Sequence, residues 1–200
     1  MDAEFWNQRY GTPQYIYGET PNSFVAEIAS QIPAGPVLCL AEGEGRNAIH
    51  LATLGHPVTA VDQSAAGLAK ARRLAAARGV DIETVIADLE NFTIEPGTWS
   101  GIVATFAHLP PAIRRQVHAQ AALGLRPGGV FVLEAYNPAQ LAFDTGGPKS
   151  PELLMTLAGL RDELAGLKFL VGREIEREVI EGNGHTGRGA VVQILARRNE

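Results

Sequence analysis

An apolar run that leads directly into a glycine-rich turn is the feature that most constrains the fold of this chain. Residues 37–48 read VLCLAEGEGRNA, so the turn carries Gly43 and Gly45. Glycine adopts backbone conformations that other residues avoid and lets a ligand approach the main chain. A helix that starts at Arg46 would direct its unpaired first amides toward that ligand. The pattern predicts a strand, a turn and a helix that form a nucleotide pocket.

A second apolar run, VTAVD, ends in an acid at Asp62, 17 residues after Gly45. A carboxylate at the end of a buried strand is costly unless it has a partner or reaches water. In nucleotide-binding folds an acid at this place grips the two ribose hydroxyls. A short glycine pattern alone is equally explained by a steric turn, and Asp62 shifts the balance toward a ligand pocket.

The two glutamates inside the glycine turn indicate which nucleotide fits. Glu42 and Glu44 occupy the place where a dinucleotide would put its pyrophosphate, and like charges about 4 Å apart repel by about 4 kcal/mol at an effective dielectric near 20. S-adenosylmethionine has no phosphate, and its methionine end carries a net positive charge. We therefore expect S-adenosylmethionine rather than NAD. One or both glutamates can instead point into solvent, which is what we expect for Glu44.

Helical and strand patterns alternate along the chain, and continuous apolar runs of this kind are typical of a parallel sheet covered on both faces. The tail differs, because residues 169–180 and 190–196 flank a glycine-rich turn at 181–189 and predict an antiparallel hairpin. Asn22 and Ser64 are expected to cap helices. The expected strands start at Val37 and cover 57–62, 82–87, 101–107 and 130–135, and the expected helices cover 24–32, 46–55, 64–79 and 111–125, with another that Ser150 and Pro151 open.

Polar residues recur where the expected parallel strands end, at the sheet edge where ligands bind in open α/β folds. These residues are Glu42, Asp62, Asp88, His108 and Tyr136. Each residue also has an explanation that does not involve a binding site, since Asp88 can cap a turn and loops are polar in any case. Their joint placement favours a site, and His108 is the preferred general base because it is the one histidine expected at this rim.

Two flanking segments complete the expected site. The first 17 residues hold five aromatic side chains, whereas disordered tails are aromatic-poor, so we expect residues 1–20 to pack as an arm or lid. Residues 136–149 form a long loop rich in glycine and proline, and such loops inside compact domains are commonly functional.

Composition excludes several classes of protein. With 46% hydrophobic and 20% charged residues in 200, the chain is an ordinary globular sequence that one domain accommodates. A net charge of -5 argues against nucleic-acid partners. No apolar stretch reaches the roughly 20 residues that span a bilayer, and we expect a cytoplasmic protein. The single cysteine, Cys39, excludes an internal disulfide and reads as a core residue, and no metal site is expected.

The chain resembles class I S-adenosylmethionine-dependent methyltransferases, and more narrowly the branch related to tellurite-resistance and thiopurine methyltransferases. The motifs that carry the resemblance are WNQRY, YGETPNSF, VLCLAEGEGRNA, VTAVDQS, IADLENF, GIVATFAHLP, LRPGGVFVLEAYNP and TGGPK. The resemblance implies a Rossmann-like α/β fold with strand order 3-2-1-4-5-7-6 and an antiparallel last strand. It implies a single domain over 1–200, with the arm at 1–20 and the core at 36–198.

The same resemblance implies residue roles. Gly43 and Gly45 would lie along the methionine moiety, Asp62 would hold the ribose, Asp88 would face the adenine amino group, and residues 105–108 would border the transferred methyl. The family pattern usually has an acid and a glycine where this chain has Cys39 and Ala41, so either Glu42 supplies the carboxylate or that contact is absent. The expected cofactor-binding residues are Arg9, Tyr17, Glu42, Gly43, Gly45, Asn47, Asp62, Gln63, Asp88, Leu89 and Thr105, with His108 as the catalytic residue.

The expected reaction is methyl transfer to a small molecule, with a soft sulfur, selenium or tellurium nucleophile favoured. Orientation provides much of the acceleration, and a base is needed only when the acceptor arrives protonated. Two alternatives stay open: a non-catalytic S-adenosylmethionine sensor or scaffold, and an NAD(P)-dependent Rossmann oxidoreductase. The expected partner is the acceptor alone, with no nucleic acid or membrane, and the chain is expected to be a monomer or homodimer.

Overall fold

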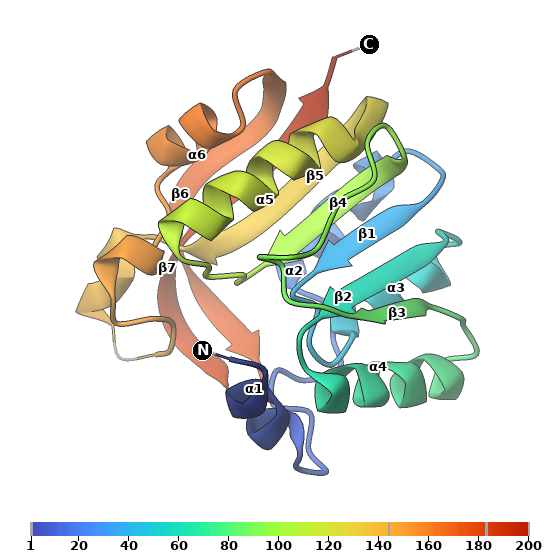
Figure 1. Ribbon diagram of the computed structural model, residues 1–200. Helices are drawn as coiled ribbons and strands as arrows, with labels where there is room; N and C mark the ends of the chain where they lie inside the picture. The colour runs from blue at the N-terminus through green and yellow to red at the C-terminus, as the bar shows by residue number, and fades with distance from the viewer. Residues whose placement is uncertain (1, 144, 183, 200) are drawn as a thin grey trace.

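Seven strands form one mixed sheet at the centre of the computed structural model, which describes residues 2–143, 145–182 and 184–199 (Figure 1). The strands are β1 Val37–Leu40, β2 Val58–Asp62, β3 Glu83–Ile86, β4 Trp99–Thr105, β5 Leu125–Tyr136, β6 Leu167–Glu181 and β7 His185–Arg198. Their order is β3-β2-β1-β4-β5-β7-β6. Strands β1 to β5 pair in parallel, and β7 runs antiparallel to both β5 and β6. The expected Rossmann-like topology is confirmed.

Helices cover both faces of the sheet, because the sheet strands have two apolar sides. The helices are α1 Ala3–Tyr10, α2 Ser23–Ile28, α3 Arg46–Thr53, α4 Ala65–Ala77, α5 Pro111–Gly124 and α6 Leu157–Glu163. Alternate residues of β1 enter different cores: Leu38 and Leu40 pack with side chains of α5 and α6, whereas Val37 and Cys39 pack with those of α2, α3 and α4. This burial on both sides explains the continuous apolar runs in the sequence.

Two of the expected helix caps are present. The Asn22 side chain accepts hydrogen bonds from the amides of Phe24 and Val25, both 3.0 Å long, and α2 follows. Ser64 Oγ accepts from the amide of Gly67 at 3.0 Å at the start of α4. Both side chains satisfy donors that the first helical turn leaves unpaired.

The region after β5 differs from the sequence-based prediction. Ser150 and Pro151 do not open an α-helix, since Pro151–Leu153 forms only a short 3-10 turn. The buried side chains of Leu154 and Met155 follow in extended backbone, and α6 begins only after Thr156, whose hydroxyl accepts from the amide of Gly159 at 3.1 Å. Two more 3-10 turns cover Ala29–Gln31 and Pro138–Ala142.

The carboxy-terminal hairpin is longer than expected. Strands β6 and β7 remain paired as far as Glu181 and His185. Glycines at 187 and 189, which suggested a broad turn, lie within β7 and take part in strand pairing. As a consequence, His185 is the first residue of a strand and does not lie in a turn. No helix among the described residues is long and apolar enough to cross a membrane.

Candidate active site

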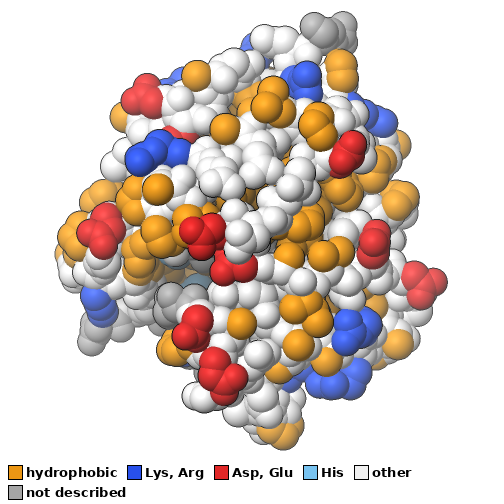
Figure 2. Space-filling view, viewed as in Figure 1, with side chains coloured by type: hydrophobic (Ala, Val, Ile, Leu, Met, Phe, Trp, Pro, Cys, Tyr) orange, Lys and Arg blue, Asp and Glu red, His pale blue; other side chains and the backbone are white. Residues whose placement is uncertain are grey.

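A cavity of about 580 Å³ lies at the carboxyl ends of the parallel strands. Its wall includes the arm, the glycine turn, the loop after β4, residues 146–150 and the start of β7. Figure 2 shows a hollow on this face of the molecule, with carboxylate side chains near its rim and a histidine inside. The predicted residues that line the cavity are Arg9, Tyr17, Glu42, Asn47, Asp62, Gln63, Asp88, Leu89, Thr105 and His108.

The two glycines of the turn, Gly43 and Gly45, are not among the residues that line the cavity. Both have positive φ angles, +60° at Gly43 and +93° at Gly45. A Cβ on Gly43 would lie 2.7 Å from the Tyr10 hydroxyl, and a Cβ on Gly45 would lie 2.5 Å from the Ala71 Cβ. The glycines therefore let the arm and α4 pack against the turn.

Glu42 is buried beneath the turn, with 8% of its surface exposed. Its Oε1 accepts hydrogen bonds from the amides of Asn47 and Ala48 at 2.9 and 2.8 Å. The sequence analysis predicted that the first amides of α3 are free for a ligand. The structure differs, because the Glu42 carboxylate accepts hydrogen bonds from two of them. Burial raises the pKa of Glu42 to about 7, although the two amide bonds and Arg46 act in the opposite direction.

Glu44 is also buried, so the expectation that it points into solvent is wrong. Its Oε1 lies 2.6 Å from Lys70 Nζ, and its Oε2 accepts from the amide of Ile16 at 2.8 Å. Lys70 Nζ also donates to the carbonyl of Gln14 at 2.6 Å. Glu44 therefore anchors the arm to α4 through a buried ion pair.

Asp62 lies at the end of β2 and lines the cavity, as predicted. Its Oδ2 accepts from the amide of Gly43 and its Oδ1 from the amide of Ser64, both at 2.8 Å. A carboxylate offers about four acceptor positions, so two remain for a ligand. Burial raises the pKa of Asp62, and the hydrogen bonds from Ser64 and Gly43 partly offset this effect.

Two further predicted residues have local hydrogen bonds in addition to their place on the cavity wall. Asp88 is exposed, and its Oδ1 accepts from the amide of Glu90 at 3.0 Å, which is the turn-capping role considered from the sequence. The hydroxyl of Thr105 accepts from Asn47 Nδ2 at 2.9 Å and so links β4 to α3.

His108 lines the cavity, but its ring nitrogens are both engaged by the backbone. Nδ1 donates to the carbonyl of Leu153 at 2.9 Å, and Nε2 accepts from the amide of Tyr136 at 3.4 Å. Burial lowers the pKa of His108 to about 4, despite the opposing effect of the Leu153 carbonyl. The imidazole is neutral and has no free nitrogen, so this geometry favours a positioning role and opposes the prediction that His108 is the base.

His185 is a cavity residue that the sequence analysis placed in the hairpin turn. Its ring centroid lies 4.6 Å from that of Tyr17 and 4.7 Å from that of Phe106. The glycines around His185 are typical of a turn, but the structure shows that β7 is paired with β6 from His185 onward. A strand that begins at position 185 places His185 at the same sheet edge as the predicted site residues.

The arm covers one side of the cavity. The rings of Trp6 and Tyr10 stack with centroids 5.4 Å apart, and the Arg9 guanidinium lies 5.6 Å from the centre of the Tyr17 ring. Asn7 Oδ1 accepts from Ser64 Oγ at 2.8 Å and ties α1 to the start of α4. Nε of Arg9 is buried and has no hydrogen-bond partner among the described residues.

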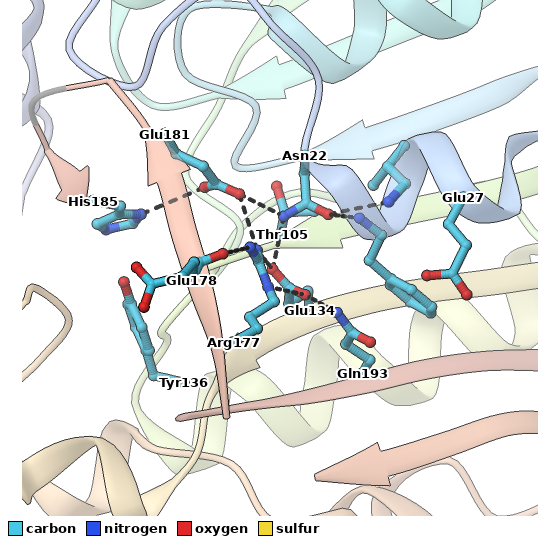
Figure 3. Close-up of polar contacts among 12 residues, drawn as sticks. Asn22, Glu27, Thr105, Glu134, Tyr136, Arg177, Glu178, Glu181, His185 and Gln193 are labelled. Carbon is cyan, nitrogen blue, oxygen red and sulfur yellow. Dashed lines mark hydrogen bonds and ion pairs between the residues drawn. The ribbon is translucent and has the colours of Figure 1, made fainter. Parts of the chain in front are cut away.

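Next to the cavity, whose wall includes Arg46, lies a polar cluster formed by the buried Asn22, Arg46, Glu134 and Glu181 and the half-buried Arg177 (Figure 3). Asn22 Nδ2 donates to Glu134 Oε1 at 2.7 Å and to Glu181 Oε1 at 2.8 Å. Arg46 and Arg177 pair with Glu181 at 2.5 and 3.2 Å, and Arg177 also pairs with Glu134. The cluster joins the segment that follows the arm, α3, β5 and the hairpin. No group of three or more potential metal ligands occurs within the described part of the chain.

Comparison with known proteins agrees with this architecture. Residues 37–129 match the family described as a methyltransferase domain, and no curated protein matches the sequence significantly. TehB from Haemophilus influenzae has a similar structure, with a TM-score of 0.73 at 21% identity over 98% of this chain and 67% of TehB. A second similar structure comes from work on the conversion of a disulfide bond into a thioacetal group during echinomycin biosynthesis. Its TM-score is 0.78 at 21% identity, over 99% of this chain and 90% of that one.

A third similar structure is an S-adenosylmethionine-dependent methyltransferase from Clostridium acetobutylicum, with a TM-score of 0.69 at 14% identity over 100% of this chain and 93% of that one. The matched domain over residues 37–129 and the strand order support an S-adenosylmethionine-dependent methyltransferase, with S-adenosylmethionine as its cofactor. The NAD-dependent alternative is set aside by the same findings.

The raised pKa of Glu42 predicts a pH-dependent difference in stability between the wild type and Glu42→Gln. The folded pKa of about 7 exceeds the ordinary value of 4.5, so the folded protein binds the extra proton, and wild-type stability falls as the pH rises from 4.5 through 7. Glutamine keeps the accepting oxygen and does not titrate. Urea unfolding without cofactor should show similar stabilities at about pH 5, and at about pH 8 the variant should be more stable by up to about 3 kcal/mol. A pH-independent difference would contradict the shifted titration.

Proposed function

We propose that this methyltransferase transfers the methyl group to a small soft nucleophile, and that a thiol is the principal acceptor. The observation that carries the proposal is the size and lining of the cavity, which has a volume of about 580 Å³ and is walled by the arm on one side and by residues 146–150 on another. Pockets of this size bind small molecules. A nucleic acid or a folded protein would not reach a methyl group beneath the arm.

The cofactor would lie along the edge of the sheet. Asp62 would accept hydrogen bonds from the ribose hydroxyls with its two remaining acceptor positions, and Asp88 would accept from the adenine amino group. At the methionine end, the unpartnered Nε of Arg9 would donate to the carboxylate. The second oxygen of Glu42 would face the cationic groups, because its first oxygen is held by α3.

The chemistry of transfer from a sulfonium requires little more than orientation. The methyl carbon is already activated, and holding the nucleophile in line with the breaking bond supplies much of the rate acceleration. Thiolates attack such a carbon directly. The structural similarity to TehB, and to the structure from work on a disulfide converted into a thioacetal, supports the tellurite-resistance and thiopurine methyltransferase branch and a sulfur acceptor.

Replacing Asp62 tests the assigned place of the cofactor. Asp62→Ala should weaken S-adenosylmethionine binding by about 1.5 to 3 kcal/mol in calorimetric titration, since a charged hydrogen-bond acceptor is lost. Asp62→Asn should lose less, because the amide oxygen still accepts. The matched control is Asp81→Ala, an exposed aspartate outside the cavity wall, which should bind normally. Equal affinity in all four proteins would remove Asp62 from the site.

The acceptor class is tested by methyl transfer from labelled S-adenosylmethionine to paired compounds of one shape. Thiophenol and phenylmethanethiol should be labelled, whereas phenol and benzyl alcohol should be labelled far more slowly, because sulfur is the softer nucleophile. Bulk tRNA and a protein extract serve as competing acceptors in the same assay. Labelling of tRNA or protein in preference to the thiols would overturn the proposal.

A further inference from the structure

His185 lies in an aromatic recess at the end of the cavity where β7 begins. Its side chain is 12% exposed, and its ring contacts Tyr17 from the arm, Phe106 from the loop after β4 and Tyr136 from the end of β5. Figure 3 shows His185 beside Tyr136 and directed toward Glu181. The cofactor contacts proposed above do not involve His185, so its side chain is available for another role.

The two ring nitrogens of His185 have different surroundings. Nδ1 is buried, has no hydrogen-bond partner among the described residues, and lies 3.7 Å from Glu181 Oε2. That distance exceeds a hydrogen bond, but catalytic pairs are commonly long in ligand-free structures and tighten when substrate binds. Nε2 makes no hydrogen bond within the described segments, so it is the nitrogen that a ligand can reach.

Glu181 is a buried carboxylate that Arg46, Arg177 and Asn22 hold in place. Burial alone would raise its pKa, but His185, Arg46 and Arg177 outweigh burial and lower the pKa to about 2. Asn22 donates a further hydrogen bond to the same carboxylate at 2.8 Å. A fixed carboxylate beside Nδ1 favours the tautomer with the proton on Nδ1, leaves the lone pair on Nε2, and stabilises the imidazolium once it forms.

We propose that His185 is the general base for a protonated thiol acceptor and that Glu181 is its positioning residue. This inference rests on the proposed function of thiol methylation. In the proposed step the S–H proton passes to Nε2 while a sulfur lone pair forms the bond to the methyl carbon. The bond from that carbon to the sulfonium breaks, and its electron pair stays on the cofactor sulfur. The products are a methyl thioether, S-adenosylhomocysteine and an imidazolium, which returns its proton to water.

The recess also indicates what kind of thiol fits. The rings of Tyr17 and Phe106 line the cavity and offer apolar faces, and sulfur makes favourable contacts with aromatic rings. We expect an uncharged thiol with an apolar or aromatic substituent. The titratable or charged groups that surround His185 are Tyr17 with Arg9 stacked on it, Tyr136, His108, and Glu181 with its partners Arg46 and Arg177.

Two thiols of different acidity test the role of His185. At pH 7 phenylmethanethiol is almost fully protonated, whereas the more acidic thiophenol is substantially ionised and needs no base. His185→Gln should slow transfer to phenylmethanethiol by about 100-fold, the usual contribution of a general base, and transfer to thiophenol by less than about threefold. Raising the pH should restore the rate with phenylmethanethiol as its thiolate fraction grows.

The matched control is His108→Gln, which alters the other histidine of the cavity wall and should slow both thiols by the same factor. An equal loss with both thiols in His185→Gln would make His185 a structural or binding residue, and an unchanged rate would make it a bystander. Wild-type protein that binds S-adenosylmethionine but labels neither thiol would instead contradict the proposed function.

A spectroscopic measurement checks the proton position without turnover. With ¹⁵N-labelled histidine, the His185 resonances, assigned by their loss in His185→Gln, should show the Nδ1–H tautomer in the neutral ring. Glu181→Gln should shift that tautomer equilibrium, because the amide is a weaker acceptor than the carboxylate. A His185 ring with its proton on Nε2 in the wild type would overturn the assignment.

Discussion

The buried carboxylate of Glu181 is the point on which the arrangement of the site depends. It lies at the end of β6 and receives Arg46 from α3, Arg177 from its own strand and Asn22 from the segment that follows the arm. Removing one member of such a cluster leaves an uncompensated buried charge, which costs about 3–5 kcal/mol. Helix α3, the segment that follows the arm and the hairpin are therefore held in one geometry, because separating these buried charges is costly.

Paired charges and hydrogen bonds also determine the cofactor side of the cavity. Glu42 caps the amides of α3, so a pyrophosphate at this helix end would meet a carboxylate where dinucleotide-binding folds offer free donors. Glu44 pairs with Lys70 and holds the arm over the cavity. Each glutamate of the turn thus has a structural partner, and the remaining oxygen of Glu42 is the one available to a cationic ligand.

Much of the fold could be predicted from the sequence because its signals are local. Apolar runs, the caps at Asn22 and Ser64, and the acid of Asp62 each report on neighbouring residues, and the structure confirms the elements they predicted. The strand order came from family resemblance, since pairing between distant strands leaves no local signal.

The details of the site depended on contacts that the sequence does not display. The ion pair between Glu44 and Lys70 spans 26 positions, and burial of Glu44 could not be inferred without it. His185 was misplaced because glycines within a paired strand resemble a turn. Ala41 has a φ of +50°, the left-handed conformation that favours the glycine of the family pattern, so an absent glycine did not mean an absent turn.

The central claim is that S-adenosylmethionine binds between the sheet edge and the arm, and amide hydrogen exchange tests it most directly. Cofactor should slow exchange across residues 2–20, because ligand contacts hold the arm on the cavity, while α6, which does not line the cavity, exchanges as before. Exchange in residues 2–20 that is identical with and without saturating cofactor would contradict the account.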